Sequence, residues 1–355
     1  MSGTSLDGVD AVLAEFDGGR LHAVAASHLP YDDVLRAELL QLHTTGSDEL
    51  HRAALLANRL SDHYADAVAE VLLAGRAAPS DVAAIGCHGQ TVRHRPELGY
   101  SLQLVSGARL AESAGITVVT DFRNRDIAAG GQGAPLVPAF HQAMFARPAR
   151  RLVIANIGGI ANLTRLAPGE PVIGFDCGPG NMLMDAWIMK SRGELLDRDG
   201  AWAAGGKVLP ELLAVLLREP YLDLAPPKST GRELFNAEWL ARVVGGSDDA
   251  ADVQRTLLEY TAETMARAID TFCQGTQEVL LCGGGARNRT LRARLSERLH
   301  PAEVRVSDEV GIAAEQVEAM AFAWLARRTL RGETGSLPDV TGARQPRVLG
   351  AIYPV

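Results

Sequence analysis

The chain has 355 residues, of which 47% are hydrophobic and 22% are charged, and its formal net charge is −8. These values are typical of a soluble globular protein with room for two domains. We expect no nucleic-acid partner, because the lysines and arginines form no basic run, and no membrane partner, because no apolar stretch is long enough to span a bilayer.

The first half of the chain predicts an α/β layer pattern. Residues 9–32 contain two apolar runs separated by Asp17, Gly18 and Gly19, which is a signal for a β-hairpin. The periods of the apolar residues and the turn residues between them predict the elements that follow. In order, these are a short helix (33–43), a long helix (48–75), a buried strand (82–92), a helix (107–115) and a strand (116–122).

The second half predicts another α/β arrangement. Residues 149–181 contain three strand candidates interrupted by glycines, and the stretch from about 194 to 236 has the composition of an insertion. We infer a duplicated α/β chain with a cleft between its halves. The remaining predicted elements are helices at 182–191, 252–272, 289–299 and 315–330, a buried strand at 278–282 and an apolar terminus at 347–355 that pairs or packs.

The predicted domains follow from this order. The first is residues 1–122, joined by part of 331–355, and the second is residues 123–330.

Three glycine-rich turns stand out as candidate ligand loops. They are Ser2–Gly8, Asn156–Asn162 and Cys282–Asn288, each beside an apolar run. Glycines allow successive backbone N–H groups to converge on an anion, and hydroxyl and amide side chains add donors. No P-loop and no complete GxGxxG occurs. A single loop is better explained as a plain turn, but three loops favour a long polyanion such as ATP.

Asp176 is the strongest candidate for a catalytic base. It follows an apolar run and precedes Gly178-Pro179-Gly180, where a carboxylate commonly faces a cleft. The alternative is that Asp176 caps the helix that begins near Met182.

Four other polar positions are ambiguous. Arg123 and Arg125 are suited to a carboxylate or sugar but equally to a surface ion-pair cluster. His88 is either a ligand or a polar core residue, and Glu318 lies on an apolar helix face where it needs a partner or a ligand.

Eight motifs, in their order, resemble one known family, the anhydro-N-acetylmuramic acid kinases. They are MSGTSLDGVD, HGQTV, DFRNRDIAAGGQGAPLVP, NIGGIANLT, GFDCGPGN, PPKSTGRELF, CGGGARN and VEAMAFAWLA, and the match continues to GAIYP near the end. The resemblance implies the fold of sugar kinases, actin and Hsp70-type ATPases. In this fold, duplicated actin/hexokinase-like (ribonuclease H-like) α/β domains hold ATP and the sugar in an interdomain cleft.

The resemblance also implies a reaction and a set of site residues. ATP and water open the 1,6-anhydro bridge of anhydro-N-acetylmuramic acid and phosphorylate O6, with Asp176 as the base for water. Asp7 is implied as a carboxylate near Mg²⁺, through water. The implied ATP phosphate site is Ser2, Gly3, Thr4, Ser5, Leu6, Asp7, Gly8, Asn156, Gly158, Gly159 and Asn162. The implied nucleoside site is Gly283, Gly284, Gly285 and Asn288, and the implied sugar site is His88, Gln90, Thr91, Arg125 and Glu318.

Two positions depart from the family pattern. The stretch from Leu102 to Gly107 reads LQLVSG where members have LQIGD, so no site residue is assigned there. Cys177 stands where threonine is common. Two other functions remain open: a kinase of the same fold that transfers directly to a hydroxyl of another sugar or acid, and a non-catalytic ATP- or sugar-binding regulator.

The resemblance further implies a cytoplasmic homodimer. Four cysteines without a CxxC pair or a zinc spacing agree with reduced thiols in the cytosol. The family pattern has an apolar strand directly before the opening loop. We therefore hypothesise that the true start codon lies upstream and that Met1 is an internal methionine.

Overall fold

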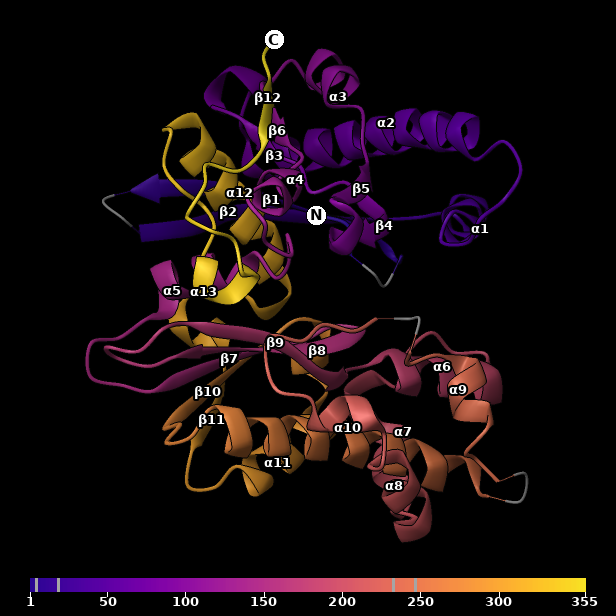
Figure 1. Ribbon diagram of the computed structural model, residues 1–355. Coiled ribbons are helices and arrows are strands. Elements are labelled where there is room, and N and C mark those ends of the chain that lie inside the picture. Colours follow the sequence, from indigo (N-terminus) through magenta and orange to yellow (C-terminus); the bar gives the residue numbers. More distant parts are fainter. Residues whose placement is uncertain (4–5, 18–19, 232–233, 246–247) are drawn as a thin grey trace. The chain divides into compact units, whose positions relative to one another are not determined.

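The computed structural model describes residues 1–3, 6–17, 20–231, 234–245 and 248–355, and its contacts divide the chain into two units (Figure 1). The first unit is Met1–Met144 with Gln316–Val355, and the second is Phe145–Glu315. Residues 123–144 and 316–330 therefore belong to the first unit, whereas the sequence placed them in the second domain. The C-terminal part of the first unit begins at Gln316 because α12 (Val317–Leu330) packs closely on β3 of that unit. A Cβ at Gly86 of β3 would lie 2.2 Å from the carbonyl oxygen of Phe322 in α12.

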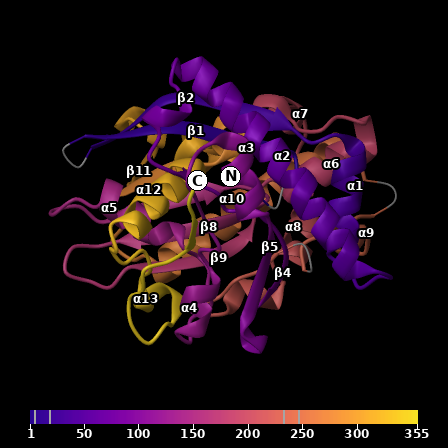
Figure 2. The same cartoon turned by 90° about the horizontal axis from the view of Figure 1, so that it is seen from above.

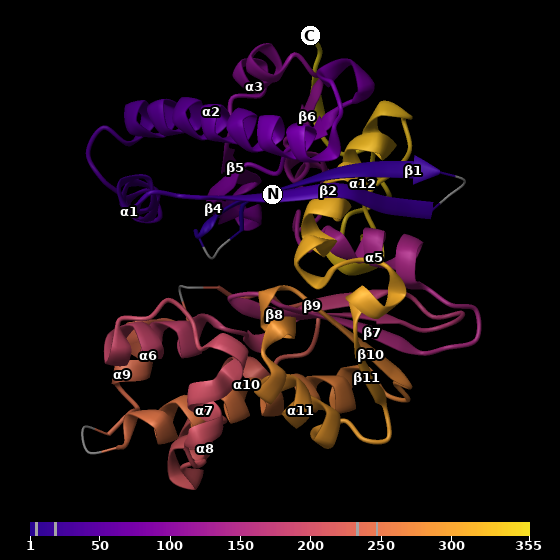
Figure 3. The ribbon, with the colours of Figure 1, turned by 180° about the vertical axis from the view of Figure 1, so that it is seen from behind.

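The first unit contains the predicted hairpin, formed by β1 (Gly8–Asp17) and β2 (Arg20–Pro30) in antiparallel register. β1 contacts both α2 and α12, and the hairpin lies under α2 in Figures 2 and 3. The other elements of this unit are α1 (Asp33–Gln41), α2 (Glu49–Gly75), β3 (Ile85–Gly86), β4 (Gln90–Arg95), β5 (Tyr100–Leu104), α3 (Gly107–Ala114), β6 (Val118–Thr120), α4 (Asn124–Ala128), α5 (Val137–Phe145), α13 (Pro338–Thr341) and β12 (Ala351–Tyr353).

The prediction of one continuous strand over residues 82–92 is wrong. The strand β3 ends at Gly86, and the chain turns at Gly89, whose φ of 76° is the left-handed conformation that glycine tolerates best. The polar residues after the turn then pair with β5 in a separate hairpin. The apolar terminus does pair, because β12 lies antiparallel to β6 in the sheet β12–β6–β3.

The second unit is built on one five-stranded sheet of order β11–β10–β7–β8–β9. β7, β8 and β9 form an antiparallel meander, and β10 and β11 continue it in parallel. This is the strand order expected of a ribonuclease H-like domain, and the mixed α/β prediction is confirmed. The elements of this unit are β7 (Leu152–Ile157), β8 (Ile160–Leu166), β9 (Ile173–Pro179), α6 (Met182–Arg192), α7 (Ala201–Gly205), α8 (Pro210–Leu216), α9 (Ala237–Ala241), α10 (Ala250–Phe272), β10 (Glu278–Cys282), α11 (Arg289–Arg298) and β11 (Glu303–Val306).

The segment predicted as an insertion contains two short α-helices, α7 and α8, and short 3₁₀ turns among its described residues. α7 and α8 both pack against α10, so this segment extends the helical layer of the second unit. α10 and α11 lie side by side on one face of the sheet (Figures 1 and 3). The short 3₁₀ helix η4 (Pro220–Asp223) contacts β9 and so brings part of this segment to the strand that carries Asp176.

Candidate functional site

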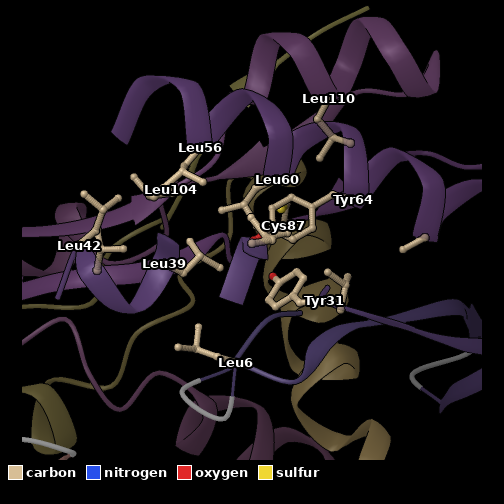
Figure 4. Close-up of a cluster of buried hydrophobic side chains, with 14 of the residues drawn as sticks. Leu6, Tyr31, Leu39, Leu42, Leu56, Leu60, Tyr64, Cys87, Leu104 and Leu110 are labelled. Carbon is tan, nitrogen blue, oxygen red and sulfur yellow. The ribbon is translucent and has the colours of Figure 1, made fainter. Parts of the chain in front are cut away.

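The opening loop of the first unit is anchored by Leu6. Its side chain is 1% exposed and lies in the buried cluster with Tyr31 and Leu39 (Figure 4). Its φ of 56° is a left-handed conformation that is rare for a leucine, so packing holds the backbone in a turn that it would otherwise avoid. The next residue, Asp7, is exposed. Leu6 thus fixes the loop, and Asp7 is presented to solvent.

Ser2 and Gln90 join the opening loop to the start of β4. The Ser2 hydroxyl bonds the Tyr31 hydroxyl at 2.7 Å and donates to Gln90 Oε1. Gln90 Nε2 donates to the Gly3 carbonyl at 3.2 Å. The structure therefore brings together two sets that the sequence assigned to different ligands, phosphate and sugar. Thr4 and Ser5 lie outside the described residues.

His88 links the same loop to Arg123. Its Nδ1 lies 3.2 Å from the Ser2 carbonyl, and its Nε2 lies 2.9 Å from Nη2 of Arg123. The carbonyl requires a donor at Nδ1 and the guanidinium an acceptor at Nε2, so the imidazole is neutral. Burial, aided by the charge of Arg123, holds the pKa of His88 well below its usual range. His88 is thus a buried bridge, packed on Phe322 with ring centroids 4.8 Å apart.

The remaining sugar-site candidates of the first unit have different surroundings. Thr91 accepts a hydrogen bond from Gln103 at 3.1 Å within the β4–β5 hairpin. Arg125 is exposed on α4. Glu318 is half-buried in the first turn of α12. Burial lowers the pKa of the Met1 amino group, and the nearby charge of Glu318 offsets part of this effect.

Asp126 organises the glycine run that follows Arg125. It is fully buried, accepts from the Gly133 N–H at 2.8 Å and accepts from the Thr341 hydroxyl at 2.9 Å. Arg123 donates to the carbonyl of the same Gly133 at 2.8 Å. Asp126, Thr341 and Arg123 therefore form a network of hydrogen bonds that shapes the turn at Gly133.

In the second unit, four predicted or adjacent positions form a row across the sheet. Asp176 of β9 pairs with Asn162 of β8, Asn162 with Asn156 of β7, and Asn156 with Cys282 of β10. Directly paired residues project from the same face of a sheet. Cys282 Sγ lies 3.6 Å from Asn156 Oδ1, as this register requires. Three of the predicted polar residues therefore line one face in a single row.

Asp176 lies within β9 and is not a helix cap. The N-cap of α6 is Asn181, so the capping alternative is wrong. One oxygen of the Asp176 carboxylate accepts from the Thr230 N–H at 3.0 Å, and its backbone is held by the Lys228 carbonyl and by the Tyr221 hydroxyl. The carboxylate is half-buried and fixed on a strand, as a positioned base requires.

Lys228, Thr230 and Tyr221 all hydrogen-bond Asp176, and sequence reasoning gave none of them a role. The motif PPKSTGRELF was recognised as part of the resemblance, but no role was given to it. A lysine between prolines and hydroxyl residues was the available signal. The hydrogen bond from Asp176 N–H to the carbonyl of this lysine, more than 40 positions away in the sequence, comes from the fold alone.

The loops around this row interlock through their backbones. The Gly158 carbonyl accepts from Asn181 N–H at 2.8 Å, and the Gly159 carbonyl accepts from Gly180 N–H at 2.9 Å. A Cβ at Gly180 would lie 2.2 Å from the Gly158 oxygen. The turn of Asn156–Asn162 is therefore packed directly on the start of α6, and substitution there displaces it.

The third glycine loop packs on the second one, Asn156–Asn162. Gly283 has φ 79° and ψ 171°, a conformation found almost only in glycine, and a Cβ there would lie 2.5 Å from Asn156 Oδ1. A Cβ at Gly285 would lie 2.2 Å from the side chain of Ile157. Gly284 begins the 3₁₀ helix η5 (Gly284–Arg287), and Asn288 caps α11 by accepting from Leu291 N–H at 3.0 Å.

Cys177 is oriented into the protein. Its thiol donates to the Ala161 carbonyl at 3.3 Å, and burial strongly raises its pKa. The thiol is thus a small buried donor and is not prepared to act as a nucleophile.

Among the residues that the structure describes, no three His, Cys, Asp or Glu side chains are grouped as a metal site. No helix in this part of the chain is long and apolar enough to cross a membrane.

The whole chain, residues 1–355, matches the family model of anhydro-N-acetylmuramic acid kinase. Proteins of this name from Nitrosomonas europaea and Chromobacterium violaceum are each 54% identical to it over 100% of this chain and 98% of their own. Among solved structures, component A of the Acidaminococcus fermentans (R)-2-hydroxyglutaryl-CoA dehydratase is 13% identical, with a TM-score of 0.43 over 88% of this chain and 95% of its own. A structural likeness of that extent assigns neither fold nor ligand.

Proposed function

The chain belongs to the anhydro-N-acetylmuramic acid kinase family and is a phosphotransferase, and from this premise we propose that it opens the 1,6-anhydro ring of anhydro-N-acetylmuramic acid with ATP and water. The products are N-acetylmuramic acid 6-phosphate and ADP, and the reaction returns a cell-wall sugar to metabolism. The observation that carries the proposal is the row of Asn156, Asn162 and Asp176 on one sheet face, bordered by interlocked glycine loops.

Asp176 is the proposed general base. Its carboxylate takes a proton from water as the water oxygen bonds to C1 of the sugar. The C1–O6 bond breaks, O6 bonds to the γ-phosphorus, and ADP leaves. The fixed position of Asp176 on β9, with one oxygen held by Thr230 N–H, supports this role because proton transfer requires a defined geometry.

The proposed ATP site uses backbone groups more than charge. The glycine loops supply N–H groups and amide side chains, in keeping with a phosphoryl transfer that depends mainly on positioning and charge neutralisation. The exposed Asp7 fits a role near Mg²⁺ through water, because Mg²⁺ is commonly held by one or two carboxylates and substrate phosphates. When bound, this ion would neutralise phosphate charge.

The proposed sugar site is on the first unit. Arg125 is exposed and suits the lactyl carboxylate, and Glu318 suits sugar hydroxyls as an acceptor. Gln90 and His88 are engaged with the opening loop, so their proposed contribution is to hold the turn at Thr91 in place.

The test is an ADP-release assay with anhydro-N-acetylmuramic acid, N-acetylglucosamine or no sugar. We expect the rate of ADP release with the anhydro sugar to be far above the rates with N-acetylglucosamine and without sugar. Equal rates under all three conditions would contradict the proposed reaction.

The proposed homodimer is tested by light scattering on the purified protein, and cytoplasmic localisation is tested by fractionation of cells.

A further inference from the structure

Lys228 is buried and hydrogen-bonds Asp176 through its backbone carbonyl, but the proposed reaction gives its side chain no role. It is 9% exposed, and its ammonium lies 4.9 Å from the ring centroid of Tyr221, 5.5 Å from that of Phe272 and 5.9 Å from that of Phe175. Three aromatic faces around one ammonium are a favourable cation–π environment. Burial of a lysine is costly without such partners.

The hydrogen bonds of Lys228 tie two segments together. Its Nζ donates to the carbonyl of Tyr221 at 3.3 Å and to that of Leu222 at 3.0 Å, both in η4. The side chain therefore fastens η4 to the segment 227–230, from which Lys228 itself comes.

Both fastened segments hold Asp176. From η4, the Tyr221 hydroxyl donates to the Asp176 carbonyl at 2.8 Å. From 227–230, the Lys228 carbonyl accepts from Asp176 N–H at 3.2 Å, and Thr230 N–H donates to the carboxylate at 3.0 Å. Every one of these contacts depends on the relative position of segments that the ammonium joins.

We propose that Lys228 is a positioning residue for Asp176, whose buried ammonium locks η4 and residues 227–230 around the carboxylate. This inference rests on the proposed role of Asp176 as the base. The ammonium also supplies a positive charge that acts on Asp176. The other titratable groups that act on the ammonium are Cys177 on β9 and Asp223 in η4.

The first test is Lys228→Met in the full chain, with Lys207→Met as the matched control. Methionine keeps an unbranched stem among the rings but removes the charge and both donated hydrogen bonds, whereas Lys207 is exposed. We expect kcat to fall about 100-fold in Lys228→Met, because small displacements of a catalytic group cost about that much. KM for ATP and for the sugar should stay within about threefold, and the acid limb of the kcat–pH profile should move to higher pH.

A purely structural role would give another result. It would lower the melting temperature and the active fraction while kcat per folded molecule and the pH profile stay unchanged, and that outcome would overturn the proposal. Tyr221→Phe serves if Lys228→Met fails to fold, because it keeps the ring and removes only the donor to Asp176. We expect a fall in kcat of about tenfold with unchanged KM; an unchanged kcat would count against the proposal.

A second readout does not need turnover. With [¹³Cγ]aspartate, the signal of Asp176 is assigned by its absence in Asp176→Asn, and its titration is compared between the wild type and Lys228→Met. We expect the carboxyl to titrate at higher pH in the variant, because a neighbouring positive charge is lost. Identical titrations would overturn the electrostatic half of the proposal, whereas a wild type inactive on the anhydro sugar would refute the proposed function instead.

Discussion

Asn162 of β8 and Asp176 of β9 are cross-strand register partners, and the register slips by one residue between Ala161 and Asn162. The slip leaves Cys177 opposite no residue of β8, with its thiol buried against the Ala161 carbonyl. A bulge of this kind commonly re-aims a side chain next to a functional site. Here it accompanies the placement of Asp176 in the row that Asn162 and Asn156 continue.

Asp176→Asn tests the base. The amide keeps the size and can still accept a hydrogen bond from Thr230 N–H, but it cannot take a proton. We expect kcat to fall by about 10²–10⁴-fold, with the Kd for ATP nearly unchanged by calorimetry. Asp270→Asn, on an exposed part of α10, is the control and should retain full activity. Turnover that persists in Asp176→Asn would remove Asp176 from the mechanism.

Gly180→Ala tests the interlocked loops. The new Cβ would lie 2.2 Å from the Gly158 carbonyl oxygen, so the turn of Asn156–Asn162 must move. We expect a loss of about 1–3 kcal/mol in unfolding free energy and a higher KM for ATP. Gly205→Ala is the matched control, because its Cβ meets nothing within 4 Å. If both variants behave alike in melting and kinetics, the interlocking does not matter for the site.

Leu6 allows a separate test of backbone strain in the opening loop. Leu6→Ala removes a buried side chain and should cost about 2–5 kcal/mol in unfolding free energy. Leu6→Gly removes slightly more packing but relieves the left-handed φ of 56°. We therefore expect Leu6→Gly to be no less stable than Leu6→Ala in urea unfolding. A glycine variant clearly below the alanine variant would show that the conformation is not strained.

We expect the buried His141 to lower the unfolding free energy of the protein in mild acid. Burial lowers its pKa to about 3 in the folded chain, from about 6.5 when unfolded. The unfolded state therefore binds a proton at His141 more readily than the folded state does. The contribution of His141 to the unfolding free energy is complete above about pH 6.5. It falls as the pH drops toward the folded pKa, by up to about 1.4 kcal/mol per pH unit. His141→Gln should flatten the dependence of unfolding free energy on pH between about 5 and 6.5. His51→Gln, at an exposed position, should leave it unchanged; equal slopes for the two variants would contradict this account.

Local patterns predicted most helices and strands correctly. The hairpin, the two helices of residues 33–75, the three-stranded meander and the pairing C-terminus all follow from periodicity and turn residues. The prediction of one strand over residues 82–92 failed because the apolar run continues into the turn at Gly89. The sequence pattern does not show that β3 before this turn and β4 after it belong to different sheets.

The site could be predicted only in part. Motif resemblance singled out Asp176 and the glycine loops, but partners remote in sequence were out of reach. Lys228 reaches Asp176 through η4, and Arg123 reaches Ser2 through His88, so neither link is visible in any local pattern. Ser2 and Asn288 carry good ligand-binding side chains, yet their oxygens already serve Gln90 and the start of α11.

The most direct measurement is the fate of water oxygen during turnover of anhydro-N-acetylmuramic acid with ATP in H₂¹⁸O. We expect one ¹⁸O at C1 of the 6-phosphate product, shown by mass spectrometry of the product quenched before anomeric exchange. We also expect Asp176→Asn to form no such product. Phosphorylated product with no label at C1 would contradict the hydrolytic mechanism and would favour direct transfer to a hydroxyl group.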